Sequence, residues 1–280
     1  MKNRIKVFGM AAAVFLPFAI LSAVAIHQLD KNARQDIERT VVAKVDACMA
    51  AVEREIGRHA AVNQTLGTAV DDDLNRLQKH AALVLDEMRP DWLNIVLARG
   101  AEQVFNLRLT NGREPLAPTR DPAANARVAA TRRAEIDGVQ IDHSRVPEPF
   151  IVVRTPVHQA GKPSPYVLIG VVRAWAFTEV LRKCGALDPE WRLGLTDQYG
   201  RIVGRNSAQD PRDSFIGQSV SASVLDGLSR GRRFFFASSR DGMRFYIGVA
   251  RSERYGWSVN LGVPSHVMDA TLDRQKNGGL

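Results

Sequence analysis

The sequence predicts an α+β protein in which an N-terminal transmembrane helix and a long helix are followed by two tandem modules with antiparallel sheets. Three observations predict it: an uncharged segment near the start, an apolar stripe with helical spacing after it, and an order of strands and turns that occurs twice. The chain has 280 residues, of which 45% are hydrophobic and 24% charged. That composition is typical of a folded chain and excludes a disordered or collagen-like one.

The net charge of +8, from 38 Lys and Arg against 30 Asp and Glu, hints at a nucleic-acid or anionic-lipid partner. Three of the cations, Lys2, Arg4 and Lys6, lie at the N-terminus, where residues 1–27 contain no acidic residue. The rest of the chain therefore carries 8 − 3 = +5, a modest surplus for its length. We expect no nucleic-acid partner.

The uncharged segment 7–26 is long enough to cross a bilayer. At a helical rise of about 1.5 Å per residue, it covers a hydrocarbon core of roughly 30 Å. By the positive-inside rule, residues 1–6 form a cytoplasmic tail, residues 7–27 a signal anchor, and the bulk of the chain is periplasmic or extracellular. We expect a single-pass protein of the inner (cytoplasmic) membrane. A cleaved secretory signal is the alternative, because Ala23-Val24-Ala25 fits the small-x-small cleavage pattern.

Residues 30–62 carry the apolar stripe of a long, membrane-rooted helix. Its members recur every three or four residues: Ile37, Val41, Val45, Cys48, Val52 and Ile56. The stripe suits packing against the protein's own core, and it also suits pairing with a second copy, so we expect a homodimer through this helix. Three aspartates, Asp71 to Asp73, then place negative charge where a second helix begins, and Pro90 ends that helix.

Beyond Trp92 the pattern changes from helices to strands. In a membrane-distal module at 63–176, strands are expected at 92–99, 104–109, 149–157 and 166–175, with a short helix within 115–138. A membrane-proximal module at 177–264 begins with a helix that Gly185 ends. It repeats the order, with two strands in 191–206, a helix at 220–229, and strands at 232–238, 243–252 and 256–263. Residues 265–280 form an exit helix and tail.

An internal duplication accounts for the repeated order. The segment IGVVRA at 169–174 matches IGVARS at 247–252, and each follows a strand, a glycine-containing turn and a tyrosine. Trp92 and Trp191 each open a strand, turn and strand unit that ends near an asparagine and an arginine. The matching order predicts that the two modules share one fold.

Cys48 and Cys184 are the two cysteines, and an exported chain permits a disulfide between them. The alternative is a pair of small buried residues without a partner, which we favour because nothing in the sequence brings the two together. No histidine lies at metal-ligand spacing from another histidine or a cysteine; the six are His27, His59, His80, His143, His158 and His266. No metal and no cofactor is expected.

The sequence contains no recognisable catalytic motif. Asp197 and Gly200 suit the turn between two strands in which they lie. The glycine-rich stretch 227–231 lacks the Gly-Lys-Ser/Thr ending of a phosphate-binding loop. We therefore expect no enzymatic activity in these residues, with an unrecognised hydrolase as the alternative.

The order of these parts resembles the double Cache extracytoplasmic sensor domains of bacterial receptors, above all those of sensor histidine kinases. The resemblance rests on Trp92 to Arg108, on Trp191 to Asn206, and on Tyr255-Gly256-Trp257 through Val263-Pro264. It implies two PAS-like modules, a small-molecule pocket in the distal one, and signal input to a receptor truncated before its second spanning helix and output domain. The alternatives are a chemoreceptor or diguanylate cyclase input domain, and a stand-alone anchored periplasmic binding protein.

The resemblance places the ligand in the distal module, where an arginine fork is the usual means of holding a carboxylate. The polar candidates are Asn106, Arg108, Arg154 and Arg173, and the aromatic walls are Trp92, Tyr166 and Trp175. The alternative for Arg173 is a role in the fold, because Arg251 occupies the matching position of the repeat. The amino-acid-binding pattern of part of this family is not visible, so an amino-acid ligand is not favoured.

Overall fold

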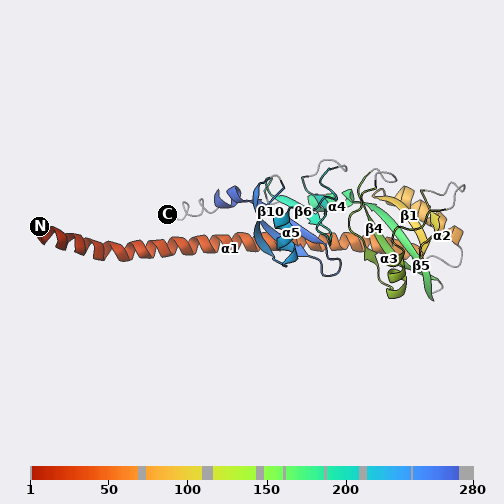
Figure 1. Cartoon of the computed structure of the whole chain (residues 1–280), viewed down its shortest axis with the longest axis horizontal. Coiled ribbons are helices and arrows are strands. Elements are labelled where there is room, and N and C mark those ends of the chain that lie inside the picture. Colours follow the sequence, from red (N-terminus) through yellow and green to blue (C-terminus); the bar gives the residue numbers. More distant parts are fainter. Residues whose placement is uncertain are drawn as a thin grey trace.

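The computed structural model describes residues 2–68, 74–108, 116–142, 148–159, 162–185, 188–207, 213–240 and 242–270. Helix α1 (Lys2–Thr68) is the longest element, and two sheet-bearing modules lie along its C-terminal part (Figure 1). The N-terminal part of α1 extends beyond both modules. The predicted aspartates Asp71 to Asp73 and the tail 271–280 lie outside the described residues.

The apolar stripe of α1 is buried within the chain itself. Val41, Val45 and Val52 have no exposed surface, and Cys48 and Ile56 are almost as deeply buried. The helix packs on strands of both modules, β4 (Phe150–Gln159) and β9 (Arg244–Arg251), and on helix α4 (Trp175–Cys184). The long helix is thus confirmed. Its stripe is filled by the chain's own core and does not present a free apolar face to a second copy. A homodimer through α1 stays a prediction.

The anchor predicted at 7–27 lies in the part of α1 whose side chains, Val24 and His27 excepted, are outside the described residues. Among the side chains that are described, no helix has the length and apolar character needed to cross a membrane.

The distal module holds one antiparallel five-stranded sheet in the order β2-β1-β5-β4-β3. Its strands are β1 (Trp92–Arg99), β2 (Glu102–Asn106), β3 (Glu135–Ile136), β4 and β5 (Lys162–Arg173). Helix α2 (Leu74–Leu83) and the π-helical turn η1 (Val84–Met88) precede the sheet, ending before Pro90 as predicted. Helix α3 (Pro122–Thr131) lies between β2 and β3, where the sequence predicts a short helix.

The proximal module repeats this order strand for strand, as β7-β6-β10-β9-β8. It consists of β6 (Arg192–Thr196), β7 (Ile202–Arg205), α5 (Ala222–Ser229), β8 (Phe234–Ser238), β9 and β10 (Ser258–Pro264). The prediction that the two modules share one fold is therefore confirmed. Trp92 opens β1, and Trp191 immediately precedes the equivalent strand β6. The match of 169–174 with 247–252 is wrong in detail: the first lies largely in β5, which corresponds to β10, and the second in β9, which corresponds to β4.

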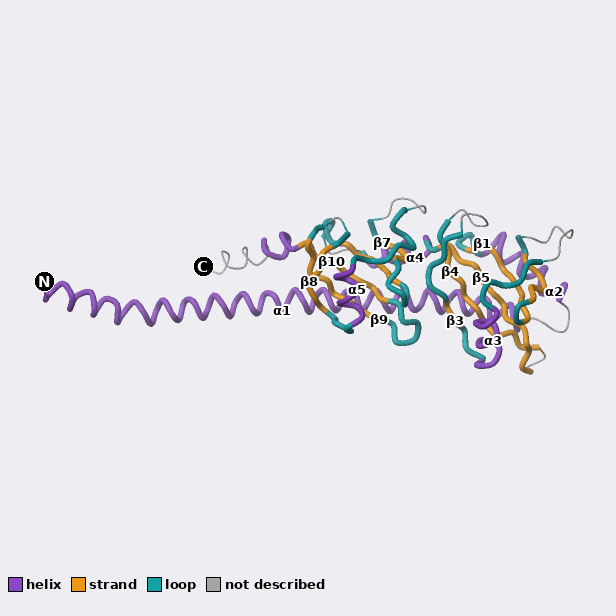
Figure 2. The backbone as a smooth tube through the Cα atoms, viewed as in Figure 1, coloured by secondary structure: helices purple, strands orange, loops and turns teal. Residues whose placement is uncertain are grey.

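Each sheet has an inner face towards α1 and an outer face away from it. The inner faces share one core with the α1 stripe, to which Leu97 and Leu168 contribute from the distal sheet and Leu195 and Leu261 from the proximal one. The outer faces are covered separately, by α3 over the distal sheet and α5 over the proximal sheet (Figure 2). Residues 265–270 are helical, as predicted for the exit helix.

A disulfide joins Cys48 of α1 to Cys184 at the end of α4. The two Cα atoms lie 5.6 Å apart, across a sequence separation of 136 residues. The expectation of two unpaired thiols is therefore wrong. The pairing depends on tertiary packing, because α4 leads from one module to the other and packs against α1. Gly185 ends α4 at a φ of 65°.

Candidate ligand-binding site

The outer face of the distal sheet combines an apolar floor with charged and amide side chains. Its floor is a small cluster of buried hydrophobic residues, made by Leu93, Val96, Ala98, Phe150, Val152, Val167 and Ile169 together with Val128 of α3. An apolar surface with a few fixed polar groups is the usual lining of a small-molecule site. We refer to this surface as the outer face.

Strand register places three of the predicted polar residues on the outer face. Residues directly opposite each other on neighbouring strands share a face of the sheet. Asn106 pairs with Val96, Arg154 pairs with Ile169, and Arg173 pairs with Phe150. Since the three partners belong to the floor, the polar side chains rise from the same surface.

Arg154 is a buried charge with two partners. It is 4% exposed; its Nε donates to Oδ1 of Asn125 on α3 at 2.9 Å, and its Nη1 lies 2.6 Å from Oδ2 of Asp137. A buried guanidinium is tolerated only when it is paired and hydrogen-bonded in this way. Asn125 and Asp137 thus hold the arginine against the floor.

A chain of amides runs along the β1 and β2 side of the outer face. Asn94 donates to Oδ1 of Asn106 at 2.7 Å, and Asn106 donates to Oε1 of Gln103 at 2.8 Å. Arg108 continues it, since its backbone nitrogen donates to Oδ1 of Asn94 at 3.2 Å and its Nε donates to the Leu93 carbonyl at 2.7 Å. Asn106 and Arg108 are thereby fixed in one network.

Arg173 lies near Arg108, so the outer face carries two like charges close together. Its Nε donates to the Pro90 carbonyl at 3.2 Å, and its Nη1 pairs with Glu148. Burial, and next the positive charge of Arg108, lower the pKa of Arg173 below its usual range. An anion bound beside both guanidinium groups would relieve this repulsion.

The three predicted aromatic walls do not line the outer face. Trp92 is 1% exposed in the core around α1, where its Nε1 donates to Nδ1 of His59 at 2.8 Å. Tyr166 packs against the same inner core. Trp175 begins α4, with the guanidinium of Arg182 4.7 Å from its ring centre. On β5, Tyr166 faces the side of the sheet opposite to its neighbour Val167. A bulge at the start of β1 turns Trp92 inward, and Trp175 lies in α4 rather than in the sheet.

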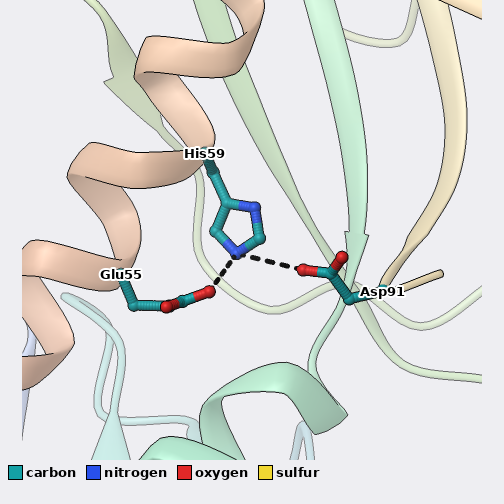
Figure 3. Close-up of side chains that lie close together, drawn as sticks. All are labelled: Glu55, His59 and Asp91. Atoms are coloured by element: carbon teal, nitrogen blue, oxygen red, sulfur yellow. Dashed lines mark ion pairs between the residues drawn. The ribbon is translucent and has the colours of Figure 1, made fainter. Parts of the chain in front are cut away.

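A second polar cluster lies where α1 meets the start of β1 (Figure 3). Nε2 of the fully buried His59 is 3.2 Å from Oε1 of Glu55 and 3.7 Å from Oδ2 of Asp91. The three side chains offer ligand atoms within 4.8 Å of one another, a set that could hold a metal ion. The spacing of histidines and cysteines in the sequence does not indicate this cluster, because it combines one histidine with two carboxylates.

Hydrogen bonding at the other imidazole nitrogen argues against metal binding. His59 Nδ1 accepts from Trp92 Nε1 and lies 2.9 Å from Nη2 of Arg89, which is also 2.5 Å from Asp91. With two donors at Nδ1, the ring proton lies on Nε2, the atom that a metal would need. Arg89 also supplies the positive charge of the cluster. These residues therefore fit a hydrogen-bonded link between α1 and β1 better than a metal site.

Asn94, Gln103, Asn125 and Asp137, which hydrogen-bond or pair with the predicted polar residues, are not among the residues predicted from the sequence. Asn94 lies in a predicted strand and is two residues from Val96, so the period of two could have placed it on this face. Asn125 and Asp137 lie within 115–138, a segment without a sequence periodicity that fixes its orientation. The packing of α3 on the sheet brings Asn125 to Arg154, and the pairing of β3 with β4 brings Asp137 to it.

Comparisons with known proteins find similarity in structure alone. No protein-family model matches the chain, and no curated protein is similar to it in sequence. The ligand-binding domain of the Pseudomonas aeruginosa amino acid chemoreceptor PctB, in complex with L-Arg, superposes with a TM-score of 0.62 at 15% identity over 88% of this chain and 94% of that one. The ligand-binding domain of the Pseudomonas fluorescens chemoreceptor CtaA, in complex with L-serine, gives 0.61 at 12% identity over 83% and 99%.

The extracellular domain of mmHK1S-Z2, described as a histidine kinase, gives a TM-score of 0.56 at 12% identity over 83% of this chain and 98% of that one. These structures share the long helix and two PAS-like modules with the present chain. The fold is therefore that of the double Cache sensor domains, as the sequence predicts.

Proposed function

We propose that the chain is the small-molecule-sensing part of a bacterial transmembrane receptor, lying outside the cytoplasm. The observation that carries the proposal is the outer face of the distal sheet, an apolar floor that bears the buried Arg154 and, at its rim, the neighbouring Arg108 and Arg173. This arrangement suits a small organic solute with an acidic group. The structural neighbours support the sensing role, since they are ligand-binding domains of chemoreceptors and the extracellular domain of a histidine kinase.

The boundaries that we propose follow from the described elements. The distal module runs from the end of α1 to β5, and the proximal module from α4 to β10. The N-terminal part of α1 and the helix 265–270 project from the same end of the molecule (Figure 1). That geometry supports anchoring of α1 in the inner membrane, with an output domain such as a histidine kinase beyond it.

A line of packed rings offers a route from the distal to the proximal module. The ring of Trp92 in β1 lies 5.9 Å from that of His59, which lies 5.9 Å from Phe177 of α4. Phe177 in turn packs edge-on against Trp257 of the proximal module at 5.3 Å. A ligand that favours one arrangement of the distal sheet would shift the equilibrium between two arrangements of this contiguous core. The size of the shift is set by the difference in the ligand's affinity for the two arrangements.

The test is a thermal-shift screen of the full chain against organic acids, amino acids, sugars and amines, followed by calorimetry of each compound that raises the melting temperature. The double variant Arg108→Gln/Arg173→Gln should weaken binding of the selected compound about tenfold or more, the loss of a charge-assisted contact. Arg251→Gln, an exposed arginine of β9, is the matched control and should leave binding unchanged. Equal affinity for wild type and the double variant, or no compound that binds, would reject the proposal.

A further inference from the structure

A cavity of about 450 Å³ lies between the two modules, outside the set of residues that the proposed function uses as ligand contacts. Its distal wall includes the carboxylates of Asp121, Glu135 and Asp137 together with the guanidinium of Arg127, so the acidic groups outnumber the basic one, and its proximal wall includes Arg201, Arg254 and Tyr255. The two walls thus present opposite charges to one another across a space large enough for a small molecule.

The positive charges of the proximal wall come from Arg201 and Arg254. The guanidinium of Arg201 lies 5.8 Å from the ring centre of Tyr199, and that of Arg254 lies 5.1 Å from the ring centre of Tyr255. Within the described part of the chain, neither arginine has an acidic group at ion-pair distance. Both therefore keep their charged hydrogen-bond donors for another partner.

The carboxylates of the distal wall are held in place but keep free acceptor capacity. Glu135 pairs with Arg127 at 3.1 Å, and Asp137 pairs with Arg154 at 2.6 Å. Asp121 caps α3 by accepting from the backbone nitrogen of Ala124 at 2.9 Å. Because an ionised carboxylate can accept about four hydrogen bonds, each of the three can bind a further donor.

We propose that this cavity is a second ligand site, which takes a dipolar small molecule. Its carboxylate is bound by Arg201 and Arg254, and its ammonium group is bound by the carboxylates of the distal wall. A ligand with two negative ends would meet repulsion at the distal wall, and one with two positive ends would meet it at the proximal wall. The charge pattern of the site therefore selects molecules whose opposite charges lie at opposite ends.

A ligand in this cavity would connect the modules at the place where they already touch. Val139 of the distal module donates its backbone N–H to Oδ2 of Asp197 in the proximal module at 3.1 Å. Gly138 permits this approach, because a Cβ atom there would lie 2.4 Å from the same oxygen. A bound dipolar molecule adds contacts to both sides of this interface and thereby stabilises the docked arrangement of the two modules.

The experiment compares three four-carbon probes that differ in their terminal charges: 4-aminobutyrate, succinate and 1,4-diaminobutane. The series of ω-amino acids from two to six carbons is added to cover different spans. Each is titrated up to about 20 mM into the purified full chain while the melting temperature is recorded, because a ligand of the folded state raises it by mass action. We expect one or more ω-amino acids to raise the melting temperature, with succinate and the diamine giving smaller shifts.

The variant Arg201→Gln/Arg254→Gln should bind the best ω-amino acid at least about tenfold more weakly than the wild type. The rise in melting temperature that this compound causes should fall accordingly. Both arginines are exposed, so the variant is expected to fold, which its melting temperature without ligand verifies. The control, Arg192→Gln/Arg244→Gln, removes two other exposed arginines and the same net charge and should keep the response. A response that survives in Arg201→Gln/Arg254→Gln, one that is as large for succinate or the diamine, or none for any ω-amino acid would overturn the proposal. Arg108→Gln/Arg173→Gln should leave the response intact, which separates this site from the outer face.

Discussion

The carboxylate of Asp197 joins the two modules, because its Oδ2 accepts a hydrogen bond from the backbone nitrogen of Val139, 58 residues away, at 3.1 Å. Its Oδ1 accepts from the backbone nitrogens of Tyr199 and Arg201, each at 2.9 Å. Asp197 is 3% exposed, so the three N–H groups depend on it rather than on water. The sequence identifies Asp197 as a turn residue, and the structure adds its contact across the module interface.

We predict that Asp197→Ala lowers the free energy of unfolding by about 3 kcal/mol, since it leaves buried backbone donors without an acceptor. Equilibrium unfolding in urea measures the change. Asp226→Ala is the matched control, because Asp226 of α5 forms an exposed pair with Arg230 and should change stability by less than about 0.5 kcal/mol. A similar, small effect of both substitutions would contradict the structural role of Asp197.

The disulfide between Cys48 and Cys184 closes a loop that contains most of the distal module. Because it restricts the unfolded chain over 136 residues, we predict that Cys48→Ala/Cys184→Ala loses about 2 to 5 kcal/mol of stability. Urea unfolding of the wild type with and without dithiothreitol provides the comparison. The reductant should destabilise the wild type and leave the double variant unchanged; an identical midpoint for oxidised wild type and double variant would show that the bridge contributes nothing.

The pH dependence of stability should depend in part on Glu55. Burial alone would raise the pKa of Glu55, but hydrogen bonds from His59 and Arg58 outweigh it and lower the pKa from 4.5 to about 2. Since the folded form has the lower pKa, the unfolded chain takes up the proton first as the pH falls. The contribution of Glu55 is complete above about pH 5 and is lost progressively as the pH falls towards about 2.

We therefore predict that Glu55→Gln is less stable than the wild type at pH 7 and that this difference shrinks as the pH falls from about 5 to 3. The urea midpoints of both proteins at about pH 7, 5, 4 and 3 measure this difference. The control is Glu102→Gln, which removes an exposed pair with Arg99 and should give a nearly constant, small difference. A difference for Glu55→Gln that does not vary with pH would contradict the assignment.

The sequence predicted the order of elements well because the local signals were strong. The stripe from Ile37 to Ile56 specifies α1, and Trp92 and Trp191 mark equivalent strands of the two sheets. The similarity of 169–174 to 247–252 paired the wrong strands, because two buried strands with a central glycine look alike wherever they lie in the sheet. Apolar composition reports burial and says little about a strand's place in the order.

For the candidate site, the sequence found residues on the right strands but could not find their partners. Asn106, Arg154 and Arg173 share the outer face because strand register is regular. Trp92 was misplaced because a bulge between Trp92 and Asn94 shifts the alternation at the start of β1. The links from Arg154 to Asn125 and from His59 to Trp92 join residues about 30 positions apart, which only tertiary packing brings into contact.

Two glycines in contrasting surroundings test how closely α1 packs on the proximal sheet. At Gly248 in β9, an added Cβ would lie 2.3 Å from Cγ1 of Val41, whereas at Gly57 in α1 nothing lies within 4 Å of it. We predict that Gly248→Ala destabilises the chain by about 1 to 3 kcal/mol, because the fully buried Val41 has no space into which to move. Gly57→Ala should instead stabilise it by roughly 0.5 to 1 kcal/mol through helix propensity. Urea unfolding of both variants gives the two signs; a neutral Gly248→Ala would mean that α1 and β9 are not in close contact in solution.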